Sequence, residues 1–430
     1  MNFRYYLQSL RLQSNDKTFD RLFYYICIFL LGGVMLRSFQ LFGSIICMYA
    51  YIQTFRTLFE EKRKCPPYWG TLRILFLIFI FLDIACVILQ SFFRGNYIWG
   101  NEWLSFMSYF FTQSTFYPAF FLPLLLFIPI KEYSLQMFLK LIPIISIISF
   151  IGMLTNFEDF LNASMTLNNQ NSEVDYESFR LFPQVVFSLF LLPFIKEKKR
   201  YIVVWLLGGI TLLVLILFAR RGGSLYTAIY LVIAIGLYLY KNNNQIIRAM
   251  VFPAIVLFFV IGSNIYQTNK SIFFKNIIKK GMHDTRSEVN EYFEKDVFNS
   301  IDLWFGRGLN GMYYCPQKYI SRKGKIEYVK YRWAIETGFY HLILKGGLFF
   351  TLLYVLILGT TAIKGLFFSR NTIVKIFAIW IILSLIELYP FGWPAFDFKY
   401  LLVWMGTVLC YHKQTRNMTN LQICNFLRIN

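Results

Sequence analysis

Long apolar runs separated by short polar segments recur along the whole chain. The runs are roughly 17 to 25 residues long, which is the length that a helix needs to cross about 30 Å of hydrocarbon. The pattern predicts an all-α fold: a polytopic membrane bundle of about twelve transmembrane helices. The predicted spans are 22–38, 40–57, 73–93, 107–130, 135–153, 181–195, 201–219, 224–240, 249–266, 336–358, 373–389 and 393–411.

The same pattern divides the chain into three regions. Residues 1–266 hold about nine N-terminal spans, residues 267–335 form one long loop, and residues 336–430 hold about three more spans and a short tail. No small-residue cleavage site follows the first apolar run, so we expect a retained span and not a signal peptide.

The composition supports a membrane protein and argues against nucleic acid or a structural metal as its partner. Hydrophobic residues make up 57% of the chain and charged residues only 15%, too few to cover the surface of a soluble domain of this length. The formal net charge of +20 does not indicate nucleic acid here, because basic residues collect at the cytoplasmic ends of spans and attract anionic lipid headgroups. The seven cysteines show no metal-ligand spacing, which argues against a structural zinc or a disulfide framework.

Charge also predicts the topology. Basic residues such as the KEKKR run at 196–200 gather in the loops on the side of the two termini, whereas segment 154–180 on the opposite side is net acidic. The positive-inside rule therefore places both termini in the cytoplasm.

Two exterior segments break this rule. Arg220 and Arg221 lie in a short turn between two predicted spans, and loop 267–335 carries thirteen Lys or Arg against seven Asp or Glu. Positive charge that topology does not require favours an anionic ligand on the outer face. The planar guanidinium fork matches phosphate oxygens, so we expect a lipid diphosphate to be bound. The candidate ligands are Arg220, Arg221, Arg286, Arg307 and Arg332.

The long loop has structure of its own. The stretch KSIFFKNIIKKGM predicts a short basic helix on the membrane surface. The next stretch predicts a second amphipathic helix with Val289, Tyr292, Phe293 and Val297 on one face. Packing on the bundle is the alternative to a direct role in binding. The glycines of GRGLNG, from Gly306 to Gly311, predict a tight turn that exposes backbone N–H groups around Arg307.

Three ionisable residues open the predicted helix that follows the loop. Glu336 and His341 are candidate catalytic residues that could orient or deprotonate an acceptor hydroxyl, and Lys345 is a candidate ligand of the substrate. On a helix, Arg332, Glu336 and Lys345 share a face, with His341 about 140° from Glu336. Each residue also has an alternative interpretation. His341 could be a buried structural histidine, Lys345 could extend toward the membrane interface, and Glu336 could form a plain ion pair with Arg332.

The order of these features resembles the superfamily of O-antigen polymerases and O-antigen ligases. The resemblance covers residues 200–365: a span that ends in Arg220-Arg221-Gly222-Gly223, one long exterior loop, the Gly306-Arg307-Gly308 turn, then ETG and KGGL on the next helix. In this comparison Arg221 corresponds to the arginine of the family's S-R-G turn, and Arg286 to an arginine that precedes an amphipathic helix of the loop.

The resemblance implies polymerisation of oligosaccharide repeat units, carried by a polyprenyl diphosphate, on the outer face of the bacterial inner membrane. Donor, acceptor, membrane lipid and a chain-length regulator protein are the implied partners, and no cofactor or metal is expected. Ligases carry a His-Asn pair where this chain has Glu336-Thr337, which favours a polymerase over a ligase. A lipid-linked oligosaccharide flippase or other transporter remains the alternative from another class.

Overall fold

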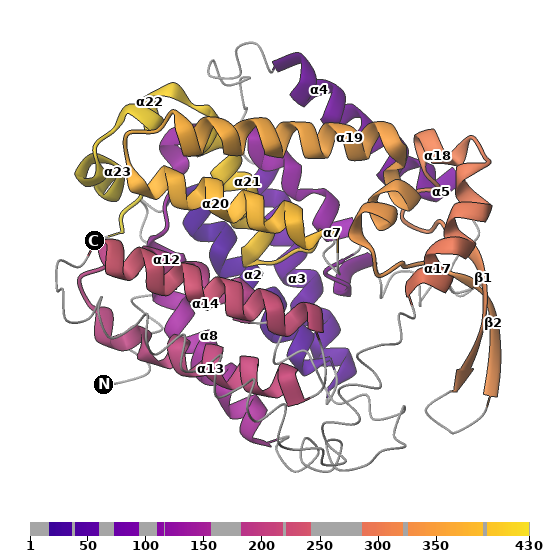
Figure 1. Cartoon of the computed structure of the whole chain (residues 1–430), viewed down its shortest axis with the longest axis horizontal. Coiled ribbons are helices and arrows are strands. Elements are labelled where there is room, and N and C mark those ends of the chain that lie inside the picture. The colour runs from indigo at the N-terminus through magenta and orange to yellow at the C-terminus, as the bar shows by residue number, and fades with distance from the viewer. Residues whose placement is uncertain are drawn as a thin grey trace, which may run out of the picture. The chain divides into compact units, whose positions relative to one another are not determined.

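The computed structural model describes residues 17–36, 39–59, 73–93, 110–115, 117–155, 182–217, 221–241, 286–320, 326–389 and 394–429. Within these ranges the chain is mostly helical and has one two-stranded sheet (Figure 1). Five helical segments there are long and apolar enough to cross a membrane, which indicates a multi-pass membrane protein. They are Thr18–Met35, Ile74–Phe92, Ile130–Ile151, Gly222–Tyr240 and Gly338–Phe367.

These five helices do not show the twelve predicted spans. The described part of each predicted span is largely helical, but span 336–358 is broken at Gly347, and two further spans are divided into short pieces. Prolines interrupt both, because proline has no N–H to donate and its ring clashes with the preceding turn. Predicted spans 107–130 and 181–195 become short pieces: α7 (Tyr117–Phe120), η3 (Leu122–Phe127) and η4 (Ile130–Glu132), then α11 (Phe182–Val185), α12 (Phe187–Leu191) and η5 (Leu192–Phe194). Predicted span 249–266 and the basic stretch KSIFFKNIIKKGM lie outside the described residues.

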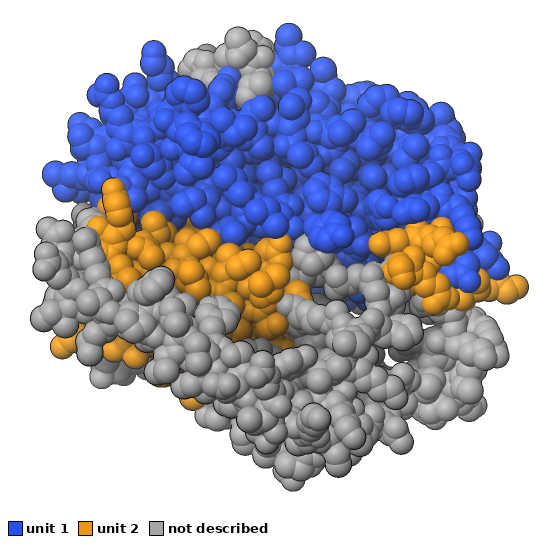
Figure 2. All heavy atoms as spheres, in the orientation of Figure 1, with its two compact units in different colours: residues 1–141, 292–315, 331–430 blue, residues 142–291, 316–330 orange. Residues whose placement is uncertain are grey.

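The chain forms two compact units, coloured separately in Figure 2. Unit 1 contains residues 1–141, 292–315 and 331–430, and unit 2 contains residues 142–291 and 316–330.

Unit 1 is built around α21 (Phe398–Tyr411), in which every residue is buried. Helix α19 (Gly338–Phe367) packs against α20 (Thr372–Glu387), and both pack against α21. Trp380 and Trp404 are the largest fully buried side chains of the described residues. Other helices of unit 1 include α7, η3 and η4, α2 (Thr18–Met35) paired with α3 (Gln40–Phe59), α4 (Arg73–Leu82), η2 (Asp83–Leu89), α5 (Gln90–Phe93), α22 (Lys413–Asn417) and α23 (Asn420–Phe426).

In unit 2, α13 (Ile202–Leu217) packs against α14 (Arg221–Lys241). α13 ends at Leu217 and α14 begins at Arg221, and residues 218–220 lie outside the described residues. α11 packs against α13, and α12 packs against α14. Helix α8 (Gln136–Thr155) begins in unit 1 and continues into unit 2.

The segment that precedes α19 contains both helix and strand. Its helix consists of α17 (Arg286–Phe293) and the π-helical turn η7 (Glu294–Phe298). The amphipathic prediction is confirmed for three of its four apolar residues: Val289, Phe293 and Val297 are buried and Tyr292 is half-buried, whereas Glu288 and Lys295 are exposed. A short helix, α18 (Asp302–Phe305), and a hairpin of β1 (Tyr313–Ile320) and β2 (Ile326–Arg332) follow.

Candidate functional site

Helix α19 is broken at Gly347, which has φ 81° and ψ 176°. A Cβ atom at this position would lie 2.2 Å from the carbonyl oxygen of Trp304 in α18. Both the left-handed φ and the close approach of another backbone require glycine. The break is therefore the place where α18 docks on α19.

The Gly306-Arg307-Gly308 turn fits against the same break. Gly306 and Gly308 have φ 71° and 73°, so the predicted tight turn is confirmed. The Arg307 N–H donates to the Leu344 carbonyl at 2.7 Å, and the Gly308 N–H donates to the Lys345 carbonyl at 3.0 Å. The prediction that the turn exposes these N–H groups to an anion is wrong, because α19 accepts them. We call the packing of Trp304, Gly306 and Gly308 against the Gly347 break the glycine lock.

The other side of the turn is held by the end of a predicted span. Gln90 donates from its side-chain amide to the Gly306 carbonyl at 2.8 Å, and Asn310 donates to the Ser91 carbonyl at 3.0 Å. The Leu309 N–H donates to the Val87 carbonyl at 3.2 Å. The turn is thus fixed between η2–α5 and α19, and its geometry is set on both sides.

Lys345 is fully buried beside the glycine lock. Its ammonium donates to the carbonyls of Leu309 at 3.0 Å, Gly311 at 2.8 Å and Trp333 at 2.6 Å, and it lies 5.3 Å from the centroid of the Trp333 ring. A lysine has three protons to donate, and these three carbonyls accept all of them. The extended conformation toward the interface is therefore wrong, and these contacts give Lys345 a structural role instead of direct contact with a diphosphate.

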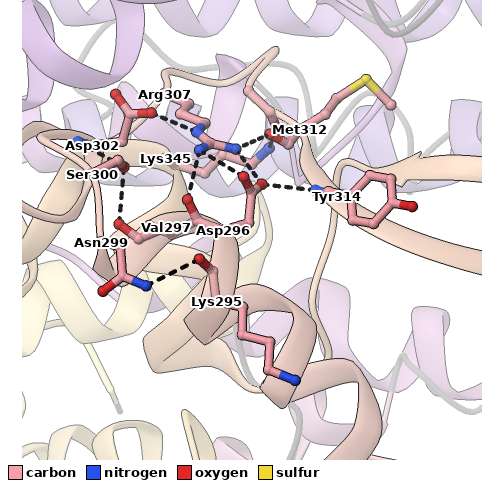
Figure 3. A network of polar contacts seen from close by, with 11 residues as sticks. Lys295, Asp296, Val297, Asn299, Ser300, Asp302, Arg307, Met312, Tyr314 and Lys345 are labelled. Atoms are coloured by element: carbon pink, nitrogen blue, oxygen red, sulfur yellow. Dashed lines mark hydrogen bonds and ion pairs between the residues drawn. The ribbon is translucent and has the colours of Figure 1, made fainter.

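Arg307 has a comparable role on the other face of the turn (Figure 3). Its guanidinium contacts Asp296 and Asp302 at 2.7 Å each and donates to the Met312 carbonyl at 2.7 Å. Burial by itself lowers the pKa of Arg307, but hydrogen bonds and charges from both aspartates outweigh that effect and raise it. With two carboxylates on one guanidinium, Arg307 joins η7, α18 and the hairpin, and we do not include it among the proposed phosphate ligands.

His341 is 1% exposed and lies one turn before Lys345. Its ring meets Trp333 edge to face, with the centroids 6.2 Å apart, so Trp333 contacts both His341 and Lys345. Tyr340 precedes His341, and its hydroxyl donates to the Glu294 carboxylate at 2.6 Å, which connects α19 to η7. This burial favours the interpretation of His341 as a packed histidine.

Arg332 and Glu336 lie in the connection between β2 and α19. Arg332 is the last residue of β2, and the helix begins only at Gly338, so the predicted helical face shared by Arg332, Glu336 and Lys345 is wrong. The hairpin displaces the start of the helix. Glu336 is exposed and Arg332 half-buried. Both charges act on Tyr313: burial raises the pKa of its phenol, Arg332 lowers it and Glu336 raises it.

The predicted residues are divided between the two units. Arg307, Arg332, Glu336, His341 and Lys345 belong to unit 1, whereas Arg220, Arg221 and Arg286 belong to unit 2. Arg220 lies outside the described residues. Arg221 is the first residue of α14 and Arg286 the first residue of α17. Helix N-termini carry a partial positive charge, so both arginines begin helices at the end that attracts anions.

Sequence reasoning missed several buried polar residues of unit 1. Asp83, Glu387 and Lys399 are all buried, and the position of Asp83 as a lone carboxylate within an apolar run is a signal that could have identified it. Within the described ranges, no group of three His, Cys, Asp or Glu side chains is placed to hold a metal ion. Comparisons with protein families, curated proteins and solved structures find no match to this chain.

Proposed function

We propose that this protein polymerises oligosaccharide repeat units linked to a polyprenyl diphosphate, on the outer face of a bacterial cytoplasmic membrane. The proposal includes about twelve spans with both termini in the cytoplasm, as the apolar pattern and the charge of the loops predict. Segment 286–335, with its helices and hairpin, then lies outside the cytoplasm.

The observation that carries the proposal is the glycine lock. The Gly306-Arg307-Gly308 turn and the KGGL segment are two of the features by which the chain resembles the polymerase and ligase superfamily, and they were selected separately in the sequence. They are in direct contact, because the Gly308 N–H donates to the Lys345 carbonyl and Gly306 packs against the Gly347 backbone. Such a contact supports the proposal that the two features form one structural unit. That unit includes the start of α19, next to the connection 333–337.

In the proposed reaction, the acceptor hydroxyl oxygen attacks the anomeric carbon of the donor sugar. The bond from that carbon to the diphosphate oxygen breaks, and the diphosphate leaves with the electron pair. Arg220, Arg221 and Arg286 stabilise the developing negative charge, helped by the N-termini of α14 and α17. Glu336, the exposed carboxylate in the connection, orients the hydroxyl and accepts its proton.

A transporter of lipid-linked oligosaccharides is the second candidate, and the broken helix α19 favours it. Transporters use helix breaks near the bilayer midplane to bind substrates and ions. In this chain the Trp304 backbone fills the break at Gly347, because a Cβ there would lie 2.2 Å from the Trp304 carbonyl oxygen. Because the break is filled by backbone, it leaves no room for a substrate or an ion, and this argues against the transporter.

Deletion of the gene, followed by gel analysis of the surface polysaccharide, tests the proposal. A polymerase mutant retains material with one repeat unit and loses all longer chains. Complete loss of surface polysaccharide contradicts the proposal and favours the transporter. Restoration of the ladder by a plasmid copy of the gene is the control.

A further inference from the structure

After the break at Gly347, helix α19 carries one continuous stripe of exposed apolar side chains. These side chains follow one another at intervals of three, four or seven residues, so they lie within about 60° of one another around the helix axis. They are Phe349, Leu352, Leu356, Ile363 and Phe367. Because α19 is a candidate membrane span, we assign this stripe to contact with lipid.

The stripe is about as long as the hydrocarbon core of a bilayer is thick. From Phe349 to Phe367 the helix rises about 27 Å, at roughly 1.5 Å per residue, and the hydrocarbon core is about 30 Å thick. Arg370, which is exposed, follows soon after Phe367 and marks one end of the span, because a charged side chain is stable only in water or among the headgroups. The other end of the span therefore lies close to Phe349 and the Gly347 break.

Beyond Phe349 the exposed apolar surface passes from α19 to α18. Within Gly338–Gly347, the part of α19 before the stripe, no residue is exposed. Helix α18 packs beside this end of α19 (Figure 1). The Phe349 ring lies 5.1 Å from the Trp304 ring and 5.8 Å from the Phe305 ring, centroid to centroid. The side chains of α18 therefore continue the stripe where α19 itself no longer presents one.

The exposed apolar side chains of residues 298–305 form what we call the α18 patch. Its members are 39% to 62% exposed and comprise Phe298, Ile301, Trp304 and Phe305. Exposed apolar patches of this kind mark interaction surfaces. The charged residues of segment 298–311 are Asp302 and Arg307, which pair with each other at 2.7 Å and whose side chains are 16% and 19% exposed. Contact of this segment with lipid therefore removes no unpaired charge from water.

The glycine lock fixes the α18 patch to α19 through the backbone. The Trp304 carbonyl fills the break at Gly347, and the Gly306 N–H donates to the Asp302 carbonyl at 2.7 Å, which closes the end of α18. Lys345 in turn donates to the Trp333 carbonyl at 2.6 Å. The position of the patch in the bilayer therefore also sets the position of the break and of the connection 333–337.

We propose that the α18 patch is a membrane-interface anchor whose partner is the phospholipid bilayer. Ile301, Trp304 and Phe305 insert between the headgroups and the first acyl carbons, at the end of α19 opposite Arg370. The observation that selects lipid is the continuity of the patch with the lipid-facing stripe, at the depth where aromatic side chains collect in membrane proteins. The anchor holds the glycine lock at the level of the headgroups, and it does not depend on the glycosyl transfer proposed above.

Spin labels on single introduced cysteines test the depth of the patch. Ile301→Cys and Phe305→Cys are labelled in liposomes of phosphatidylethanolamine and phosphatidylglycerol, and collisions with O₂ and with a water-soluble nickel chelate are measured by electron paramagnetic resonance. The native cysteines of the described residues are buried, and labelled wild-type protein gives the background. Both labels should favour O₂, as Leu352→Cys in the stripe does. Lys295→Cys, at an exposed residue of η7, should favour the nickel chelate.

Three outcomes of this measurement overturn the anchor. Nickel access at Ile301→Cys and Phe305→Cys equal to that at Lys295→Cys would place the patch in water. Low access to both reagents would show that another segment of the chain covers the patch. Spin–spin broadening that disappears on dilution with unlabelled protein would show that a second copy of the chain covers it.

Photocrosslinking of the wild-type protein tests the same contact without a cysteine variant. The protein is placed in nanodiscs that contain a phospholipid with a diazirine close to its glycerol, and lipid adducts are located on peptides by mass spectrometry. Adducts should occur on residues 298–305. Ile301→Glu should lose them with an unchanged melting temperature in detergent, whereas Asn299→Glu, at a neighbouring exposed residue, should retain them. Adducts on α19 peptides without any on 298–305 in the wild-type protein would overturn the anchor.

Discussion

Two buried lysines of unit 1 are stabilised in different ways. Lys399 pairs with the carboxylate of Glu387, whereas Lys345 donates to three backbone carbonyls. The carbonyls at Lys345 come from the turn after Gly308 and from Trp333, so that one ammonium fixes two segments to α19. Removal of a buried donor leaves its acceptors unsatisfied, at about 1 to 3 kcal/mol for each group.

The residue scale also shows the limit of sequence reasoning. Lys345 and His341 are conspicuous in the sequence because ionisable groups in an apolar helix are costly, and Arg307 because it lies within a glycine-rich turn of the basic loop. Their structural contacts could not be predicted, because the partners of Lys345 are carbonyls, which every residue has. The partners of Arg307, Asp296 and Asp302, are ordinary acidic residues in the sequence and become distinctive only when η7 and α18 fold together.

Glu336 carries the residue-scale prediction for catalysis. Glu336→Gln is nearly isosteric and should reduce transfer by a factor on the order of 10² or more if the charge assists the acceptor hydroxyl. Chain length of the surface polysaccharide, at equal protein level in the membrane, measures this. Near-normal chains would remove Glu336 from the mechanism and leave His341 as the candidate.

An exchange of charges separates catalysis from a structural ion pair. If Arg332 and Glu336 only stabilise the connection to α19, the double variant Arg332→Glu, Glu336→Arg should regain the activity that each single change removes. A catalytic carboxylate should remain inactive in the exchanged protein, because the charge then lies at the wrong position.

At the element scale, two glycines of α19 form a matched pair. Gly347→Ala places a Cβ 2.2 Å from the Trp304 carbonyl oxygen in a left-handed conformation, whereas Gly359 has no neighbouring atom within 4 Å of such a Cβ. Gly347→Ala should destabilise the fold by at least about 1 to 2 kcal/mol. Gly359→Ala should be neutral or stabilise by up to about 1 kcal/mol. Thermal unfolding in detergent measures both, and equal melting temperatures for the two variants would contradict the glycine lock.

The elements differ in how well the sequence predicts them. The face of α17 and η7 was predictable, because Val289, Phe293 and Val297 recur at helical spacing and are buried. The hairpin was missed, although Tyr313 and Cys315 are buried and Tyr314 is exposed, as the alternation of a strand requires. Five of the twelve residues 321–332 are Lys or Arg, so the sequence of this stretch indicates a basic loop. The first residue of α19 depends on the hairpin that precedes it, so it could not be predicted without the hairpin.

At the scale of the whole molecule, topology is the first prediction. Reporter fusions after Arg200, Lys241 and Lys413 should be cytoplasmic, and fusions after Asn169 and Lys323 exterior, because basic residues are retained on the cytoplasmic side. Enzymatic activity of exterior-specific and cytoplasm-specific reporters measures each position. An exterior signal at Lys241 would place Arg220 and Arg221 on the cytoplasmic side, where the proposed donor is absent.

The central claim is that the chain itself joins repeat units with a diphosphate as leaving group. The most direct measurement incubates the purified protein with a polyprenyl diphosphate-linked repeat unit and a metal chelator, and follows glycan length and released polyprenyl diphosphate. We predict a ladder with one diphosphate released per new bond, no ladder from Arg221→Ala, and most activity lost in Arg221→Lys, because a point charge lacks the bidentate fork. No ladder from the wild-type protein, or a full ladder from Arg221→Ala, would contradict the account.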